Sequence, residues 1–223
     1  MRMVQIAGSL AEPGRLQPTQ ELSLHLSRLD HSAICEGRLE GATPPSPQAA
    51  ARFTYDPAHP VETNGGAFLL NPNIAPPAVA EQGHTACERS DILSFLSAPF
   101  ETGLHIAGEI RVSLNVKTDA PETAFTVKIS EVFGDGRVVN IRDDIQTYSP
   151  SLSAGETALV FKLVPIDWTL SAGSRLRLDI SSSNFPAFPA HLNKSGLWSE
   201  IGEPAIAEQT VMGGSLALPV LPH

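Results

Sequence analysis

The sequence predicts an all-β fold, and within that class an antiparallel β-sandwich. Apolar residues recur at every second position in several segments, which suits a strand with one buried face and not a helix. Turn-forming residues separate these segments. Of the 223 residues, 19 are proline and only 17% are charged, against about 25% charged residues in typical soluble domains. This composition indicates many turns and few helices, which favours an antiparallel sandwich over alternating strands and helices.

The longest alternation runs from Leu104 to Val116. Its even-numbered residues are apolar apart from Gly108, and the residues between them are mostly polar. A glycine inside a strand pattern predicts a bulge or a close approach of the backbone. Shorter runs predict the remaining strands. In chain order these are Glu21–Ser27, Arg52–Tyr55, Ile92–Phe95, Phe125–Ile129, Val139–Ile145, Leu159–Leu163, Leu176–Ile180 and Leu216–Leu218.

Most of the shorter strands have a clear apolar face of two or three residues. These faces consist of Leu22, Leu24 and Leu26; Phe125, Val127 and Ile129; Val139 and Ile141, with Ile145 out of step; Leu159, Phe161 and Leu163; Leu176, Leu178 and Ile180; and Leu216 and Leu218. Each face predicts a strand that packs one side against the core.

Turn residues and loops account for the rest of the chain. Gly134–Gly136 predicts a hairpin loop, and Ser153–Glu156 and Ser171–Ser174 carry similar turn residues. Two long stretches, Pro57–Glu88 and Ser181–Ala205, show no comparable run of alternating residues. Loops of this length in a compact domain are usually functional or cover a surface.

The charge pattern excludes several classes of partner. The net charge is −9, and the basic residues are scattered without a run. Binding to nucleic acid requires clustered Lys and Arg. Binding to an anionic membrane surface requires them too, so we expect neither partner. No apolar stretch approaches the length of a membrane span. Residues 1–20 are interpreted as a leader or a remnant of an upstream domain, and no signal peptide is recognised there, which predicts a cytoplasmic location.

A search for chemistry predicts no catalytic residue, no metal site and no cofactor. No G-x-S-x-G elbow occurs, and the seven histidines lack metal-binding spacing. Asp143 and Asp144 could be paired carboxylates for acid–base work, but their place between Ile141 and Ile145 favours a polar bulge or turn. Cys35 and Cys87 are interpreted as two free, partly buried thiols, with one disulfide as the alternative.

The residues alone therefore leave two classes of function open. The chain could be a binding module, such as a carbohydrate-binding jelly roll. It could instead be an accessory domain whose chemistry lies on another domain.

Five segments of the chain resemble the signatures of one family. They are Tyr55-Asp56-Pro57-Ala58-His59-Pro60-Val61-Glu62-Thr63-Asn64-Gly65-Gly66, Glu88-Arg89-Ser90-Asp91-Ile92-Leu93-Ser94-Phe95, Thr118 to Lys128, Leu176 to Pro186, and Gln209-Thr210-Val211 with Leu216 to Val220. Together they resemble the C-terminal domain of acyl esterases of the X-Pro dipeptidyl-peptidase and cocaine-esterase type.

The resemblance implies a fold and a role. The fold would be a jelly-roll β-sandwich of the galactose-binding-domain-like type over residues 21–223. The partner would be a serine α/β-hydrolase domain that carries the catalytic triad and cleaves ester or amide bonds. This chain would be non-catalytic, would pack on the hydrolase domain and would help wall its substrate pocket. A stand-alone carbohydrate-binding module is the alternative, and a role in homo-oligomer formation is a third.

The motifs also predict structural roles. Gly65 and Gly66 permit a positive φ or a close backbone approach, and Asp56 accepts local backbone hydrogen bonds. Arg89 and Asp91 are expected to form a bidentate pair. Tyr55 and Asn184 complete the set of structural motif residues, with Asn184 expected to hold the turn before Phe185.

Six apolar residues on the two long loops are candidates for the domain interface or the substrate pocket. Nonpolar side chains on loops rarely face water as a group, so we expect some of them to meet the hydrolase domain. The alternative is a small core beneath their own loops. The candidates are Phe68, Leu69, Leu70, Phe185, Phe188 and Trp198.

Overall fold

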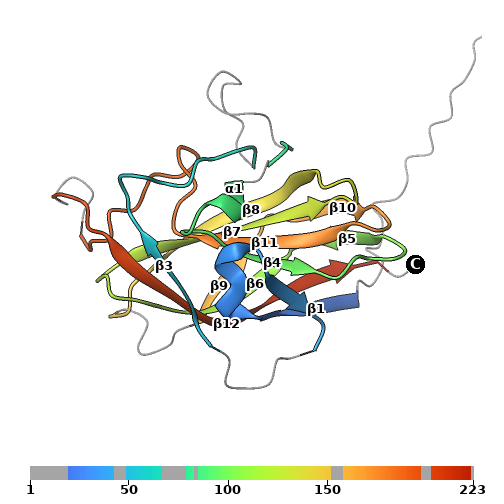
Figure 1. Ribbon diagram of the computed structural model, residues 1–223, viewed down its shortest axis with the longest axis horizontal. Helices are drawn as coiled ribbons and strands as arrows, with labels where there is room; N and C mark the ends of the chain where they lie inside the picture. The colour runs from blue at the N-terminus through green and yellow to red at the C-terminus, as the bar shows by residue number, and fades with distance from the viewer. Residues whose placement is uncertain are drawn as a thin grey trace, which may run out of the picture.

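The computed structural model describes residues 20–42, 49–66, 79–82, 85–151, 158–196 and 202–221. Within these residues, twelve strands form one hydrogen-bonded sheet that folds into two layers (Figure 1). The strands are β1 (Gln20–Ser27), β2 (Gly37–Glu40), β3 (Ala51–Tyr55), β4 (Leu93–Ser97), β5 (Leu104–Gly108), β6 (Arg111–Thr118), β7 (Thr123–Val132), β8 (Val138–Tyr148), β9 (Ala158–Lys162), β10 (Ile166–Leu170), β11 (Arg175–Ser181) and β12 (Ala207–Val220). A 3-10 helix, η1 (Leu29–Ile34), and a four-residue helix, α1 (Thr85–Glu88), complete the elements.

The first layer is built around β12, the long red strand in Figure 1. One edge of β12 pairs with β3 and then β1, and the other edge pairs with β6 and then β5. Strand β9 extends this layer beyond β6, and β10 extends it beyond β5. The second layer has the order β4-β11-β7-β8, and all its pairs are antiparallel.

Strand β2 links the two layers. It pairs antiparallel with β1 of the first layer and parallel with β4 of the second. The predicted sandwich is confirmed, with this parallel pair as the exception to the antiparallel pattern. The core lies between the layers, where Phe125 of β7 packs edge-on against Phe53 of β3 and Tyr148 of β8, at ring-centroid distances of 6.5 and 6.2 Å.

The alternating residues form the predicted strands, and the longest run is divided in two. The division falls after Gly108, between β5 and β6. Gly108 has a φ of +132°, and a Cβ there would lie 3.1 Å from Cγ of Pro219. The close backbone approach predicted from this glycine is therefore confirmed. The sequence prediction missed two short strands, β2 and β10.

Two of the three predicted turns lie within the described residues, and both are tight. Gly136 N donates to the carbonyl of Phe133 in the β7–β8 hairpin, and Ser174 N donates to the carbonyl of Ser171. The third, Ser153–Glu156, lies outside the described residues, and so does the predicted leader apart from Gln20, which begins β1.

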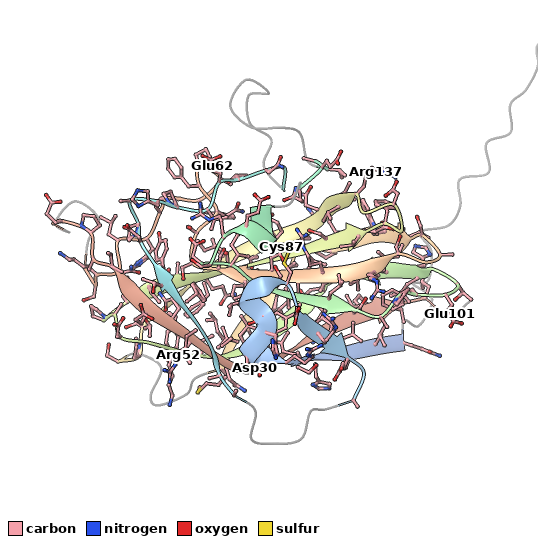
Figure 2. All side chains as sticks on the ribbon, in the orientation of Figure 1. Asp30, Arg52, Glu62, Cys87, Glu101 and Arg137 are labelled. Carbon is pink, nitrogen blue, oxygen red and sulfur yellow. A yellow bond between two sulfur atoms is a disulfide. The ribbon has the colours of Figure 1, made fainter. Side chains whose placement is uncertain are left out.

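The prediction of two free thiols is wrong. Cys35 and Cys87 form a disulfide, with their Cα atoms 5.4 Å apart. Cys35 directly follows η1, and Cys87 lies in α1, which contacts η1 (Figure 2 labels Cys87). The pairing depends on the tertiary contact between these two short helices, which periodicity and spacing do not report.

A buried carboxylate closes the sandwich at one end. Glu131 of β7 is 1% exposed. It accepts hydrogen bonds from the indole Nε1 of Trp168 on β10, at 3.0 Å, and from the backbone N of Ser171, at 2.9 Å. These bonds tie the end of the first layer to the second.

Replacement of Glu131 by alanine should lower the free energy of unfolding by about 2 kcal/mol, because two hydrogen bonds to a buried carboxylate are lost. Urea unfolding measures this loss, and the emission of Trp168 should shift to the red as β10 loosens. Glu101→Ala, at an exposed position labelled in Figure 2, is the control. Equal midpoints for the two variants would contradict the proposed role of Glu131.

Candidate functional site

A row of polar and charged side chains crosses the outer face of the second layer. The strand register places Ser94 of β4 opposite Asp179 of β11, Asp179 opposite Lys128 of β7, and Lys128 opposite Asp143 of β8. Because Val127 and the other neighbours of Lys128 in β7 point into the core, the side chains of this row point outward. We call Ser94, Asp179, Lys128 and Asp143 the charge row.

The charge row is covered, although outward residues of a sandwich normally face water. Asp179 is only 7% exposed and Asp143 9%. The cover consists of the loop after β3 and the loop after β11, which belong to the two long irregular stretches of the sequence (Figure 2 labels Glu62 at the top of the view). The sequence predicts that both stretches are functional or cover a surface, and these parts of them cover the charge row.

Backbone hydrogen bonds join the two covering loops. Thr63 N donates to the carbonyl of Phe185 at 2.6 Å, and Phe185 N donates to the carbonyl of Val61 at 2.8 Å. Val61 N donates to Oγ of Ser183 at 2.8 Å. The side chain of Gln82 adds a third segment, since its Nε2 donates to the carbonyl of Asn64 at 2.8 Å.

Hydrogen bonds and one ion pair satisfy both aspartates of the row. Asp179 Oδ1 accepts from Ser94 Oγ at 2.6 Å, and Asp179 Oδ2 accepts from Nε of Arg177 at 3.0 Å. Asp143 Oδ2 accepts from Nδ2 of Asn184 at 2.8 Å. Asn184 thus connects the covering loop to the sheet, in addition to holding its own turn through the bond from Phe188 N to its carbonyl.

A cavity of about 400 Å³ remains between the cover and the sheet. Its floor includes Lys128 and Arg177, and its walls include Val61, Ile92 and Asn184. Burial lowers the pKa of Lys128, because the charged ammonium is separated from water. The cavity therefore combines apolar and polar wall residues with two cations and with the carboxylates of Asp179 and Glu62.

Other motif residues fix the loop after β3. Asp56 accepts the backbone N of Ala58 at 2.9 Å and contacts Nδ1 of His59, and the bond from Ala58 lowers the pKa of Asp56. Tyr55 is buried at the end of β3, and this burial raises its pKa to about 12.

The expected bidentate pair is present between Arg89 and Asp91. Nε and Nη2 of Arg89 donate to the two carboxylate oxygens of Asp91 at 2.8 and 2.6 Å. Nη2 also donates to the carbonyl of His59 at 2.7 Å. The hydrogen bonds to Asp91 raise the pKa of Arg89. This arginine therefore ties the segment before β4 to the loop after β3.

Gly65 and Gly66 both have positive φ values, +70° and +106°. A Cβ at Gly66 would lie 2.7 Å from Oδ2 of Asp143. Because Gly66 has no Cβ, the loop backbone can lie in direct contact with the carboxylate of Asp143, at the end of the charge row.

Replacement of Gly66 by alanine should lower the free energy of unfolding by about 2–3 kcal/mol, from the positive φ and the clash with Asp143 together. Gly136→Ala is the matched control, because Gly136 has a φ of +90° and a Cβ added there would meet nothing within 4 Å among the described residues. Thermal unfolding of both variants separates the two contributions. An equal loss in both would show that the contact with Asp143 costs nothing.

The two adjacent aspartates do not form a pair of catalytic carboxylates. Asp143 and Asp144 occupy consecutive positions inside β8, so their side chains point to opposite faces of the sheet. The prediction of a polar bulge or turn at this pair is wrong, because both residues lie in regular register with β7, and the bulge in β8 falls at Ile141, where that register shifts. Burial raises the pKa of Asp144.

The interface candidates fall only partly within the described residues. Phe185 is 44% exposed on the covering loop, beside Glu62, and Phe188 is partly buried. Phe68, Leu69, Leu70 and Trp198 lie outside the described residues. Among the residues that the structure describes, no cluster of three His, Cys, Asp or Glu side chains could hold a metal ion, and no helix there is long and apolar enough to cross a bilayer.

The sequence does not single out the residues that make the cavity, above all Lys128, Arg177, Asp179 and Gln82. The first three belong to the polar half of the alternation in β7 and β11, which is normally interpreted as a solvated face. Only the loops that fold over this face distinguish it from an ordinary one.

Comparison with solved structures shows that this fold is similar to a part of two longer chains. It matches an aminopeptidase from the marine sediment archaeon Thaumarchaeota archaeon with a TM-score of 0.72 and 20% identity, over 92% of this chain and 37% of the other. It matches an α-amino acid ester hydrolase with a TM-score of 0.71 and 20% identity, over 90% of this chain and 36% of the other.

Sequence comparison identifies the family. Residues 9–214 match the X-Pro dipeptidyl-peptidase C-terminal non-catalytic domain, and the chain belongs to this family. It is also similar to the cocaine esterase of Rhodococcus sp. (strain MB1 Bresler), with 29% identity over 159 residues, which is 67% of this chain and 27% of that enzyme. The chain thus spans about a quarter of that relative's length. The resemblance found in the motifs is confirmed.

Proposed function

We propose that this chain is the C-terminal domain of a serine hydrolase that cleaves ester or amide bonds, and that its covered face packs on the hydrolase domain beside the substrate pocket. The family is non-catalytic, and the chain covers about a third of the solved relatives' length. The observation that carries the orientation is the covering loop, which presents Phe185 to solvent next to the cavity.

The exposed phenylalanine provides a test of this orientation. Phe185→Asp should weaken the association with the hydrolase domain about thirtyfold, as expected for an aromatic anchor at the centre of an interface. Val160→Asp is the control, because Val160 is 43% exposed but lies on β9 of the other layer. Association is measured by titration of the two domains, or by kcat/KM for an aryl ester when they form one chain. An effect of Val160→Asp alone would place the interface on the opposite layer.

The chain without a hydrolase domain should not hydrolyse p-nitrophenyl esters. Turnover that survives purification and titrates with one serine of this chain would refute the accessory role.

The alternative of a carbohydrate-binding module requires a sugar-stacking aromatic surface. The described residues that line the cavity contain no aromatic ring, which favours the accessory role, and glycan-array binding by the chain would reverse this preference. Homo-oligomer formation and a cytoplasmic location stay predictions. Disulfides persist mainly in oxidising compartments, so the redox state of Cys35 and Cys87 in the native host bears directly on the location.

A further inference from the structure

Lys128 is a partly buried cation that makes no ion pair with a described residue. Among these residues, no carboxylate oxygen lies within 4 Å of its Nζ, and its one hydrogen bond goes to Oε1 of Gln82 at 3.2 Å. The two aspartates next to it in the charge row accept hydrogen bonds from other groups. Asp143 accepts from Asn184, and Asp179 accepts from Ser94 and Arg177. A buried ammonium normally has a paired charge and further acceptors, so Lys128 has unused donors.

Arg177 presents a second set of donors to the same space. Its Nε and Nη2 face Asp179, whereas Nη1 makes no hydrogen bond with a described residue. Both Lys128 and Arg177 line the cavity of about 400 Å³. The cavity therefore offers hydrogen-bond donors from two cations, and no described carboxylate, Glu62 of the lining included, forms an ion pair with Lys128.

We propose that this cavity binds one carboxylate group, held by Nζ of Lys128 and the guanidinium of Arg177. Charge-assisted hydrogen bonds of this kind are the strong ones in proteins. A single negative charge fits better than a phosphate dianion, because Asp143, Asp179 and Glu62 surround the site and repel a second charge. This inference does not depend on the proposed function, since it concerns only the side chains of this chain.

The carboxylate has two sources. It can belong to a small carboxylic acid, or to an Asp or Glu side chain of a neighbouring domain. The chemistry at Lys128 is the same in both cases, and the experiment distinguishes them.

The test measures the pKa of Lys128 by NMR of ¹³Cε-labelled lysine in the 223-residue chain. The chain has four lysines, Lys117, Lys128, Lys162 and Lys194, so the other three signals are internal controls. The groups that face Lys128 and also contribute to its pKa are Asp143, Asp179 and Arg177. Saturation with sodium acetate should raise the pKa of Lys128 by about one unit, as an opposite charge in contact does, and leave the other lysines unchanged.

Two variants and two salts sharpen the test. Lys128→Met should weaken acetate binding about tenfold or more, whereas Lys162→Met, at an exposed position on β9, should not affect it. Sodium chloride at equal ionic strength should not move the Lys128 signal, and inorganic phosphate should bind more weakly than acetate. The proposal would be overturned if acetate left the pKa of Lys128 unchanged, if chloride raised it equally, or if phosphate bound more tightly than acetate.

A preparation that contains the hydrolase domain identifies the source. If Lys128 already has the raised pKa there and ignores acetate, the carboxylate is a side chain of the neighbouring domain. If acetate still raises the pKa, the ligand is a free carboxylic acid. Failure of the two domains to associate would refute the proposed function and would leave the acetate response of the chain as it is.

Discussion

Replacing Asp179 by alanine should lower the free energy of unfolding by about 3–5 kcal/mol, the range measured when one partner of a buried ion pair is removed. The carboxylate of Asp179 accepts from Arg177 and from Ser94, and both Asp179 and Arg177 are buried beneath the covering loops. Without it, the guanidinium stays in a site with little access to water and without its ion-pair partner. The loss comes mainly from this stranded cation and not from the pair itself.

A second substitution separates these contributions. Arg177→Met combined with Asp179→Ala removes the stranded cation and should recover most of the lost stability, because apolar replacement of a whole buried pair is often neutral. The surface pair Arg137–Asp135 is the matched control, since its atoms are 2.9 Å apart over the same two-residue spacing but both side chains are more than half exposed. Asp135→Ala should leave the urea midpoint almost unchanged. If Asp179→Ala behaved like Asp135→Ala, the charge row would be hydrated in solution and the covered face would not exist there.

Reduction of the Cys35–Cys87 disulfide should lower the free energy of unfolding by about 4 kcal/mol. The bond closes a loop with a sequence separation of 52, and on the chain-entropy account a crosslink of this span restricts the unfolded chain by that amount. The measurement is urea unfolding with and without a reducing agent, together with the Cys35→Ser, Cys87→Ser double variant.

The double variant also serves as the control for the reducing agent. The double variant should have the lowered free energy of unfolding with and without the reducing agent, whereas the parent chain should have it only with the reducing agent. Hydrogen exchange should rise first around η1, which Cys35 directly follows, and around α1, which contains Cys87. A reduced chain with two titratable thiols and an unchanged midpoint would contradict the stabilising role of the bond.

The fold was predictable because the alternation of a strand is a local property. Leu176, Leu178 and Ile180 show their burial by their spacing alone, and all three are buried in β11. Strand β2 was missed because only four residues carry the pattern. It forms through pairing with β1, on the other side of η1, and with β4, which is distant in the sequence. A short strand of this kind is determined by its neighbours and not by its own composition.

In the candidate site too, contacts between residues close in the sequence were predictable and contacts between distant strands were not. The pair Arg89–Asp91 and the turn at Asp56 were predicted because each joins residues within three positions of one another. The charge row was missed because Ser94, Asp179, Lys128 and Asp143 come from four strands. Their meeting depends on three strand registers at once, and a shift of one residue in any strand would turn its side chain to the other face.

The sequence by itself determined the all-β class, most strand positions, the family, and the local bonds of the motif loops, because these depend on residue type and short spacing. The tertiary structure decided the rest. It joined Cys35 to Cys87, divided the longest alternating run at Gly108 against Pro219, and covered the outward polar face so that Lys128 lines a cavity. The physical reason is that desolvation belongs to a place in the folded molecule: the same lysine on the same strand would be an ordinary solvated side chain if the loops after β3 and β11 did not fold across it.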